Sequence, residues 1–176
     1  MPRLQLGLMS AGLGAIAAVV ALTAWRSTPV AAQGQSSANM QVSANVIRKC
    51  VLLTNPLNFG SYDPVQTNAV AALDGQATIR VSCTKGTAVN IGMDDGTNAQ
   101  GTVRRMSGGG TNLLGYELYK DANRTQRWGA DAGERYDGGV APSRDPRDFI
   151  VYGRVPGAQD VPEGSFQDTI LVTVQF

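Results

Sequence analysis

An all-β sandwich is the fold that this sequence predicts. Six or seven short segments after residue 32 alternate apolar and polar residues, and turn signals rich in Gly, Asn, Asp and Pro separate them. No segment in that part has a convincing helical period. Strands with one apolar face favour two sheets packed face to face. Neither a domain boundary nor an internal repeat interrupts the pattern, so we expect one domain.

The first 32 residues are expected to be a signal peptide for export. Arg3 supplies a positive start, residues 4–24 carry no charge, and Val30-Ala31-Ala32 offers the small residues that signal peptidase recognises. Gln33 is then the first residue of the mature chain. An uncleaved membrane anchor is the alternative, because the uncharged run approaches the length that crosses a bilayer. The Gly, Ser and Thr residues within that run favour the signal peptide.

The mature chain of 144 residues is long enough for one domain with a hydrophobic core. Without Arg3 and Arg26 it has 13 basic and 14 acidic residues, a net charge of −1. This balance gives no nucleic-acid footprint. Cys50 and Cys83 are the two cysteines, and an exported chain reaches an oxidising compartment, so we expect one disulfide. Two buried free thiols are the alternative.

The first expected strand covers residues 40–46. Met40, Val42, Ala44 and Val46 share one face of it, and the small polar residues 33–39 before it are typical of a flexible leader. The strands expected next have the same alternation and cover residues 77–83, 89–93, 103–106, 114–118 and 149–154. Residues 121–147 are polar and Gly-rich and are expected to be long connections, with Trp128 as their one large apolar anchor.

The last expected strand is the end of the chain. Ile170, Val172, Val174 and Phe176 recur at every second position, and the sequence stops on the last of them. An apolar strand at the very end of a chain is expected to lie inside a sheet, beside a neighbour that the sequence alone does not identify.

No catalytic centre emerges from the residue types. The sequence contains no histidine, which removes Ser-His dyads, histidine metal sites and the usual general base. We therefore expect a protein that is not an enzyme and has no cofactor. Residues 94–98 superficially resemble a calcium loop, but their oxygen ligands do not alternate as such a loop requires. Trp128 with Tyr136 could form a carbohydrate platform, although a loop anchor is favoured for Trp128.

Several blocks together resemble one family. They are Phe59-Gly60-Ser61-Tyr62-Asp63, Val81-Ser82-Cys83-Thr84, Leu114-Gly115-Tyr116-Glu117-Leu118-Tyr119-Lys120-Asp121, Val151-Tyr152-Gly153-Arg154-Val155-Pro156, and residues 164–176. They are similar to the spore coat protein U domain family, which includes pilin subunits of archaic chaperone-usher fimbriae of the Csu type. The resemblance runs from about residue 40 to residue 176, and the terminal block and the Tyr-x-Leu-Tyr-x-Asp block are its most specific parts.

This resemblance implies an incomplete immunoglobulin-like β-sandwich over residues 50–176, completed by a donor strand. Residues 33–49 would be an N-terminal extension carrying that strand at 40–46. A periplasmic chaperone would fill the groove first, and the extension of another subunit would replace it at an outer-membrane usher. Met40, Val42, Ala44 and Val46 would be the donor residues, and Ile170, Val172, Val174 and Phe176 would belong to the acceptor groove.

Two alternatives stay open at this point. Residues 40–46 could instead be the first strand of the domain's own sheet, and Ala44 is small where a bulky donor residue would be expected. The leading functional hypothesis is a structural pilus subunit at the cell surface that supports adhesion and biofilm formation, with other pilin subunits as partners. The alternative is a secreted or coat-associated protein of the same fold that does not polymerise, with a glycan as its candidate ligand.

Overall fold

The computed structural model describes residues 33–176, so the expected signal peptide lies outside the described residues. The chain divides into two units at Ser43 and Ala44. Residues 33–49 contain no regular secondary structure. Within the described part, no helix is long and apolar enough to cross a membrane.

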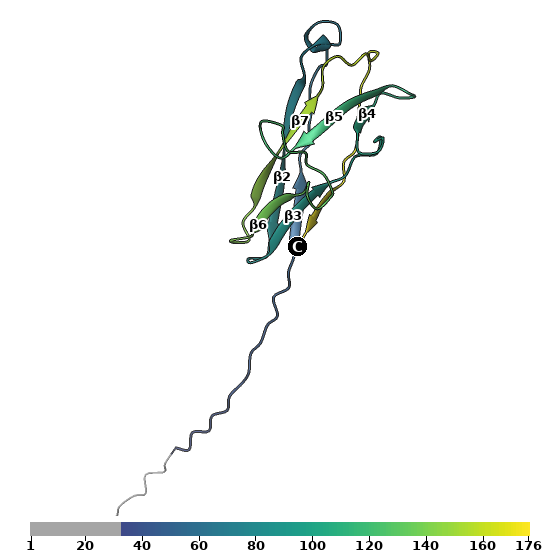
Figure 1. The fold of residues 1–176 in the computed structure, drawn as a ribbon. Helices are drawn as coiled ribbons and strands as arrows, with labels where there is room; N and C mark the ends of the chain where they lie inside the picture. The colour runs from purple at the N-terminus through teal and green to yellow at the C-terminus, as the bar shows by residue number, and fades with distance from the viewer. Residues whose placement is uncertain (1–32) are drawn as a thin grey trace, which may run out of the picture. The chain divides into compact units, whose positions relative to one another are not determined.

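The fold is nearly all β, as predicted, and consists of two antiparallel sheets (Figure 1). The larger sheet has the order β1 (Cys50–Thr54), β2 (Leu73–Cys83), β7 (Arg147–Val155), β5 (Leu113–Tyr119) and β4 (Arg104–Ser107). The smaller sheet has the order β6 (Tyr136–Val140), β3 (Ala88–Met93) and β8 (Val172–Gln175). A single 3-10 turn, η1 (Thr67–Ala69), lies between β1 and β2.

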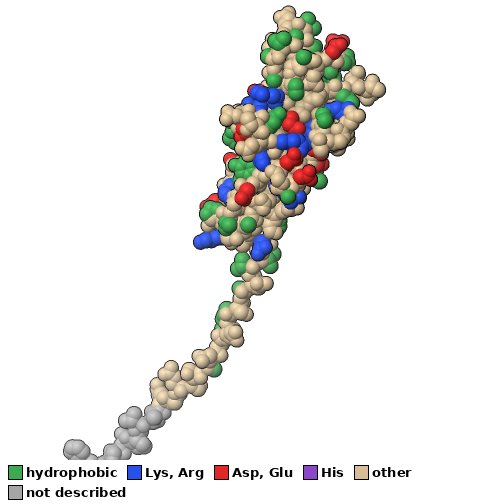
Figure 2. All heavy atoms as spheres, viewed as in Figure 1, with side chains coloured by type: hydrophobic (Ala, Val, Ile, Leu, Met, Phe, Trp, Pro, Cys, Tyr) green, Lys and Arg blue, Asp and Glu red, His purple; other side chains and the backbone are tan. Residues whose placement is uncertain are grey.

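The two ends of the domain, the base and the tip, are formed by different elements. The base is the end where β2 finishes, β3 begins and β8 finishes, because Asn90 pairs with Gln175. The tip is the opposite end and includes the loop of residues 62–72 before β2. Val65 and Val70 of this loop are 82% and 87% exposed. Figure 2 shows hydrophobic side chains gathered there.

Most of the expected strands are present within a few residues of their predicted positions, and two were missed. β1 was missed because Val51, Leu52 and Leu53 are consecutive apolar residues and give no alternation. β6 was missed because Gly138 and Gly139 interrupt it. The first strand of the structure is β1, and residues 40–46 form no regular secondary structure.

Trp128 anchors the long connection between β5 and β6 in the core. Its side chain is 0% exposed, and its Nε1–H donates to the carbonyl oxygen of Ile91 at 2.9 Å. The ring lies 5.0 Å from that of Tyr136, between centroids. A fully buried indole offers no face to a sugar, so the loop-anchor interpretation is confirmed and a carbohydrate platform on Trp128 is wrong.

A buried arginine ties the end of β3 to the larger sheet. Arg104 of β4 is 0% exposed, and its guanidinium donates to the carbonyl oxygens of Met93, Asp94 and Trp128. It also forms an ion pair with Glu117 of β5. Because a buried guanidinium without partners would be very unfavourable, these contacts fix β4 and β5 against the start of the loop after β3.

Candidate functional site

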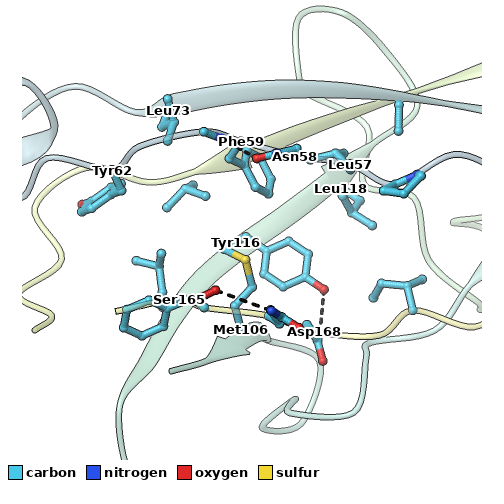
Figure 3. A pocket seen from close by; sticks show the side chains of 18 of the residues that line it. Leu57, Asn58, Phe59, Tyr62, Leu73, Met106, Tyr116, Leu118, Ser165 and Asp168 are labelled. Carbon is cyan, nitrogen blue, oxygen red and sulfur yellow. Dashed lines mark hydrogen bonds between the residues drawn. The ribbon is translucent and has the colours of Figure 1, made fainter. Parts of the chain in front are cut away.

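A long apolar groove runs along the domain between its two sheets. One wall, called here the first wall, is formed by Thr54 at the end of β1 and residues 55–62 that follow it, and the other is the C-terminal segment from Val161 to Val172. The cavity volume is about 1090 Å³. Figure 3 shows its side chains, which come from both walls and from the strands beneath. Its apolar lining includes Leu57, Phe59, Leu73, Ala77, Ile79, Met93, Met106, Leu114, Tyr116, Leu118, Val151, Val155, Val161, Phe166, Ile170 and Val172.

The two walls face each other with open backbone edges. In β1, alternate residues pair with β2, and Asn55 N–H continues this pairing by donating to Thr78 O at 3.1 Å. In the C-terminal segment, Leu171 O accepts from Asp94 N–H at 3.1 Å. Because alternate residues of a strand direct their backbone groups to opposite sides, the groups of Thr54, Ile170 and Val172 point toward the groove. One strand is therefore missing between β1 and β8.

The C-terminal wall is held in place by the carboxylate of Asp168. Its Oδ1 accepts hydrogen bonds from the backbone N–H and the hydroxyl of Thr97, at 3.0 and 2.9 Å, and from both the backbone and side-chain nitrogens of Asn98. Its Oδ2 accepts from the Tyr116 hydroxyl at 2.6 Å, as drawn in Figure 3. Gly96 permits this approach, since a Cβ there would lie 2.0 Å from Oδ2.

These contacts shift the ionisation of both partners in the Tyr116–Asp168 pair. Burial acts to raise the pKa of Asp168, but hydrogen bonds from Tyr116, Thr97 and other donors outweigh it and lower that pKa. Burial, together with the neighbouring carboxylate, raises the pKa of the Tyr116 hydroxyl. At neutral pH the pair is therefore an ionised carboxylate bound by a neutral phenol.

The rest of the C-terminal wall is fastened by backbone pairing. Ser107 of β4 and Gln167 exchange two backbone hydrogen bonds of 2.8 and 3.0 Å. Leu171 N–H donates to the side chain of Asp94 at 2.9 Å. The segment thus pairs with the larger sheet near Gln167 and with the smaller sheet from Val172 onward. The domain's own strands therefore form this wall, and no strand from another molecule is needed for it.

The floor of the groove is formed by side chains of β2, β5 and β7, and it has one feature that sequence patterns did not reveal. Gly75 of β2 and Gly153 of β7 lie directly opposite each other in the register. The side chains of Leu57 and Phe59 lie over this glycine pair, since a Cβ at Gly153 would be 2.7 Å from Phe59 and 2.9 Å from Leu57. The Phe59 ring also packs edge-on against Tyr116, with centroids 6.2 Å apart. The first wall therefore covers part of the floor.

The groove is suited to an uncharged ligand. Among the described residues that line it, Glu163 and Asp168 carry the charges, and Asp168 is occupied by the hydrogen bonds above. Buried floor residues such as Ile79 and Leu118 are 2% and 5% exposed, because half-buried wall side chains pack against them. Within residues 33–176 no cluster of His, Cys, Asp and Glu could hold a metal ion.

The sequence-predicted residues fall at different places relative to this groove. Ile170 and Val172 line it. Val174 packs against the core beside them, and Phe176 is 52% exposed. All four apolar residues of the 40–46 stripe are exposed, with Met40, Val42 and Val46 at 84%, 83% and 81% and Ala44 in the same class.

The extension is rooted in the base by covalent and hydrogen bonds. The predicted disulfide is present and joins Cys50 to Cys83, which are opposite each other in β1 and β2. The Thr84 hydroxyl accepts from Lys49 N–H at 3.1 Å and lies 3.1 Å from Ile47 O, to which it can donate. Only residues 47–49 therefore separate the apolar stripe from the anchored domain.

Sequence reasoning missed several residues that shape the groove. No role was predicted for Leu57, and Phe59 and Asp168 appeared only within blocks that carry the family resemblance. A glycine within each of two strands was the available signal for Gly75 and Gly153, because a strand glycine often marks a close approach.

Comparisons with known proteins agree with this architecture. Residues 36–173 match the Spore Coat Protein U domain. The chain is 32% identical over 181 aligned residues to Protein U of Myxococcus xanthus, which covers 96% of this chain and all of that protein.

Solved structures show a similar fold. A chaperone–tip subunit complex, CsuC–CsuE of Acinetobacter baumannii, matches with a TM-score of 0.56 and 23% identity over 74% of this chain. The chain spans only 40% of that structure's length. A chaperone-usher pilus rod matches with a TM-score of 0.51 and 14% identity, over 85% of this chain and 99% of the other.

Proposed function

Since this chain belongs to the Spore Coat Protein U domain family, we propose that it is a structural subunit of an archaic chaperone-usher pilus. Each copy inserts residues 40–46 into the groove of the next copy. The fold that it shares with chaperone-usher subunits supports this proposal.

One observation carries the proposal: the domain lacks a strand, and the same chain carries an unpaired strand-like stripe. The stripe has seven residues without charge, and the part of the floor strand β2 whose side chains line the groove spans the same length, from Leu73 to Ile79. The open edges of β1 and β8 supply backbone partners on both sides. Strand addition of this kind combines main-chain hydrogen bonds with alternate side-chain pockets.

Two arguments give the direction of the inserted strand. If Val46 lay at the base of the acceptor, the donor's body would meet that base too. Every subunit would then have to use its own base for two neighbours, the one to which it donates and the one from which it accepts. A filament could not grow in this way. Charge favours the same choice, because Arg48 and Lys49 follow the stripe at each copy's own base, whereas Glu163 lines the groove near the tip. The donor therefore runs from base to tip, antiparallel to β8.

Insertion is favourable in magnitude. Burying Met40, Val42 and Val46 with the methyl of Ala44 contributes about 5 to 9 kcal/mol at the usual value for large apolar side chains. Each new ladder hydrogen bond adds about 1 kcal/mol net. The inserted strand also covers two sheet edges that would otherwise promote aggregation.

The assembly that follows is a filament. A donor on one surface and a groove on another form a heterologous contact that does not close on itself. We infer that a periplasmic chaperone fills the groove before assembly and that an outer-membrane usher exchanges it for the next subunit. The filament then stands on the cell surface after export through the periplasm, where it supports adhesion and biofilm formation.

Replacing Val42 by Asp tests the proposal, with Ser43→Asp as the matched control. Val42 belongs to the inserted face and Ser43 to the opposite face, so both variants add one charge at neighbouring positions. We expect Val42→Asp to abolish fibres on negatively stained cells and Ser43→Asp to retain them, since an unpaired buried charge costs several kcal/mol. Fibres that persist with Val42→Asp would contradict the donor role.

A second candidate function is a secreted or spore-coat-associated protein that does not polymerise. The likeness to Protein U over its full length supports it, because the identity of 32% is higher than the 23% and 14% to the two pilus structures described above. The same experiment separates the two: a coat protein would leave cells without fibres in the wild type and in both variants.

A further inference from the structure

We propose that Phe59 determines which donor residue fits at one position of the groove, and that Ala44 is small because it faces Phe59. This inference rests on the proposed donor function and adds a size rule to it. The rule identifies the occupant at this position as the strand of a second copy of this chain, in one register.

Side chains of the groove floor lie at regularly spaced positions. Every second residue of β2 points toward the groove, which gives four successive positions, Leu73, Gly75, Ala77 and Ile79. Three of the four line the groove, and Gly75 does not. The neighbouring strand repeats this pattern, since Val151 and Val155 line the groove and Gly153 between them does not.

Two side chains of the first wall lie over the two glycines. Leu57 and Phe59 line the groove in their place, with Phe59 atoms 2.7 and 2.8 Å from where a Gly153 Cβ would be. Phe59 could not lie so close to a strand residue with a side chain. The ring is also supported from the side by Tyr116, whose hydroxyl is held by Asp168. The floor is therefore raised at this one position by a ring with little freedom to move.

The donor strand of the second copy aligns with these positions in one register. A donor that runs from base to tip puts Met40 nearest Ile79 and Val46 nearest Leu73, because the two runs have equal length. Val42 then faces the Ala77 position, and Ala44 faces the position that Phe59 fills. The smallest residue of the stripe meets the shallowest part of the groove. A shift by two residues would place Val42 or Val46 over Phe59 and leave the Ala44 methyl over a deeper position.

The test is a two-by-two binding experiment. The acceptor is the full mature chain with Val42→Asp, which weakens donation by its own stripe, prepared with Phe59 or with Phe59→Ala. The probe is a synthetic peptide of residues 36–48, with Ala44 or with Ala44→Leu. We expect Ala44→Leu to weaken binding to the Phe59 acceptor by at least about tenfold, and to bind the Phe59→Ala acceptor as tightly as the unchanged peptide or more tightly.

A control peptide with Val42→Leu distinguishes a local rule from a general one. Residue 42 faces the Ala77 position, so Val42→Leu should change the binding affinity by the same factor for both acceptors. Circular dichroism checks that each acceptor is folded. If Phe59→Ala is not folded, Phe59→Leu serves instead and is expected to recover part of the loss.

The outcomes separate this inference from the donor function. If the unchanged peptide binds and Ala44→Leu carries no penalty, or a penalty that Phe59 variants do not relieve, the size rule is overturned while the donor function stands. If no peptide binds any folded acceptor, the donor function fails, and the size rule fails with it.

Discussion

At the scale of single residues, the groove depends on polar contacts that hold its apolar walls in place. Asp168 accepts five hydrogen bonds from Thr97, Asn98 and Tyr116 and connects the C-terminal segment to the loop after β3 and to β5. Residue-level reading of the sequence could not assign this role. The partners lie 52 to 71 positions away, and their approach depends on Gly96 having no side chain.

Replacing Asp168 by Asn is expected to lower the free energy of unfolding by about 1.5 to 3 kcal/mol, the range for hydrogen bonds to a charged group. The amide would present N–H groups to donors that need an acceptor. Chemical denaturation at neutral pH measures the loss. Asp148→Asn is the control, since its carboxylate pairs with Arg80 on the exposed face of the sheet and little change is expected.

The effect of Asp168 should also depend on pH. Its pKa in the folded protein is lowered, so its stabilising effect is fully present above the ordinary value of 3.8 and is lost as the pH falls through the lowered pKa. The difference in unfolding free energy between wild type and Asp168→Asn should therefore narrow between about pH 5 and about pH 2. A difference that stays constant over this range would contradict an ionised Asp168 as the cause.

At the scale of elements, β1 is a short edge strand that lies between β2 and the groove. It pairs only with β2 within the described chain, and its other edge borders the groove. The Cys50–Cys83 disulfide fixes the start of this strand just after the extension. In the proposed filament, force pulling on the extension would reach the domain at this point.

Loss of the disulfide should destabilise the domain by about 3 to 4 kcal/mol, because the bond closes a loop over a sequence separation of 33. Denaturation of wild type and of a Cys50→Ser, Cys83→Ser double variant measures this. Adding a reductant should lower the stability of the wild type toward that of the double variant and leave the variant unchanged. Equal stabilities without reductant would contradict the prediction.

Strands were predictable where one face is buried and one is not. β5 alternates cleanly from Leu113 to Tyr119, because Leu114, Tyr116 and Leu118 face the core. β1 and β6 were not predictable, since their formation depends on partners far along the chain rather than on local alternation. The C-terminal strand was expected, but its switch between the two sheets near Gln167 was not.

At the scale of the whole molecule, the proposed function joins two features at opposite ends of the sequence. The pattern of residues 40–46 and that of the last residues could both be read from the sequence, as could the family resemblance. The resemblance implied a groove, but most of its lining could not be predicted, because Leu57, Phe59 and Asp168 come together only in the folded domain. Patterns along the chain therefore predicted the floor strands and the C-terminal wall more fully than the wall formed by residues 54–62.

Charge should steer assembly at the mouth of the groove. Glu163→Lys removes the acidic group that Arg48 and Lys49 of the donor are expected to meet, so filaments should form more slowly at low salt. Raising the salt concentration should reduce the difference from wild type. Asp131→Lys is the control, since Asp131 is exposed and lies outside the groove. Equal slowing by both variants, measured by light scattering, would contradict local steering.

The most direct test of the central claim uses the methionines of residues 33–176, which all belong to the stripe or the groove: Met40, Met93 and Met106. Isotopically light and heavy chains containing photoreactive methionine are mixed, assembled, irradiated and digested for mass spectrometry. We predict mixed-isotope cross-links between the peptide containing Met40 and peptides that line the groove. Cross-links of Met40 within single chains alone, or recovery of monomers without assembly, would contradict the claim that one copy completes the sheet of the next.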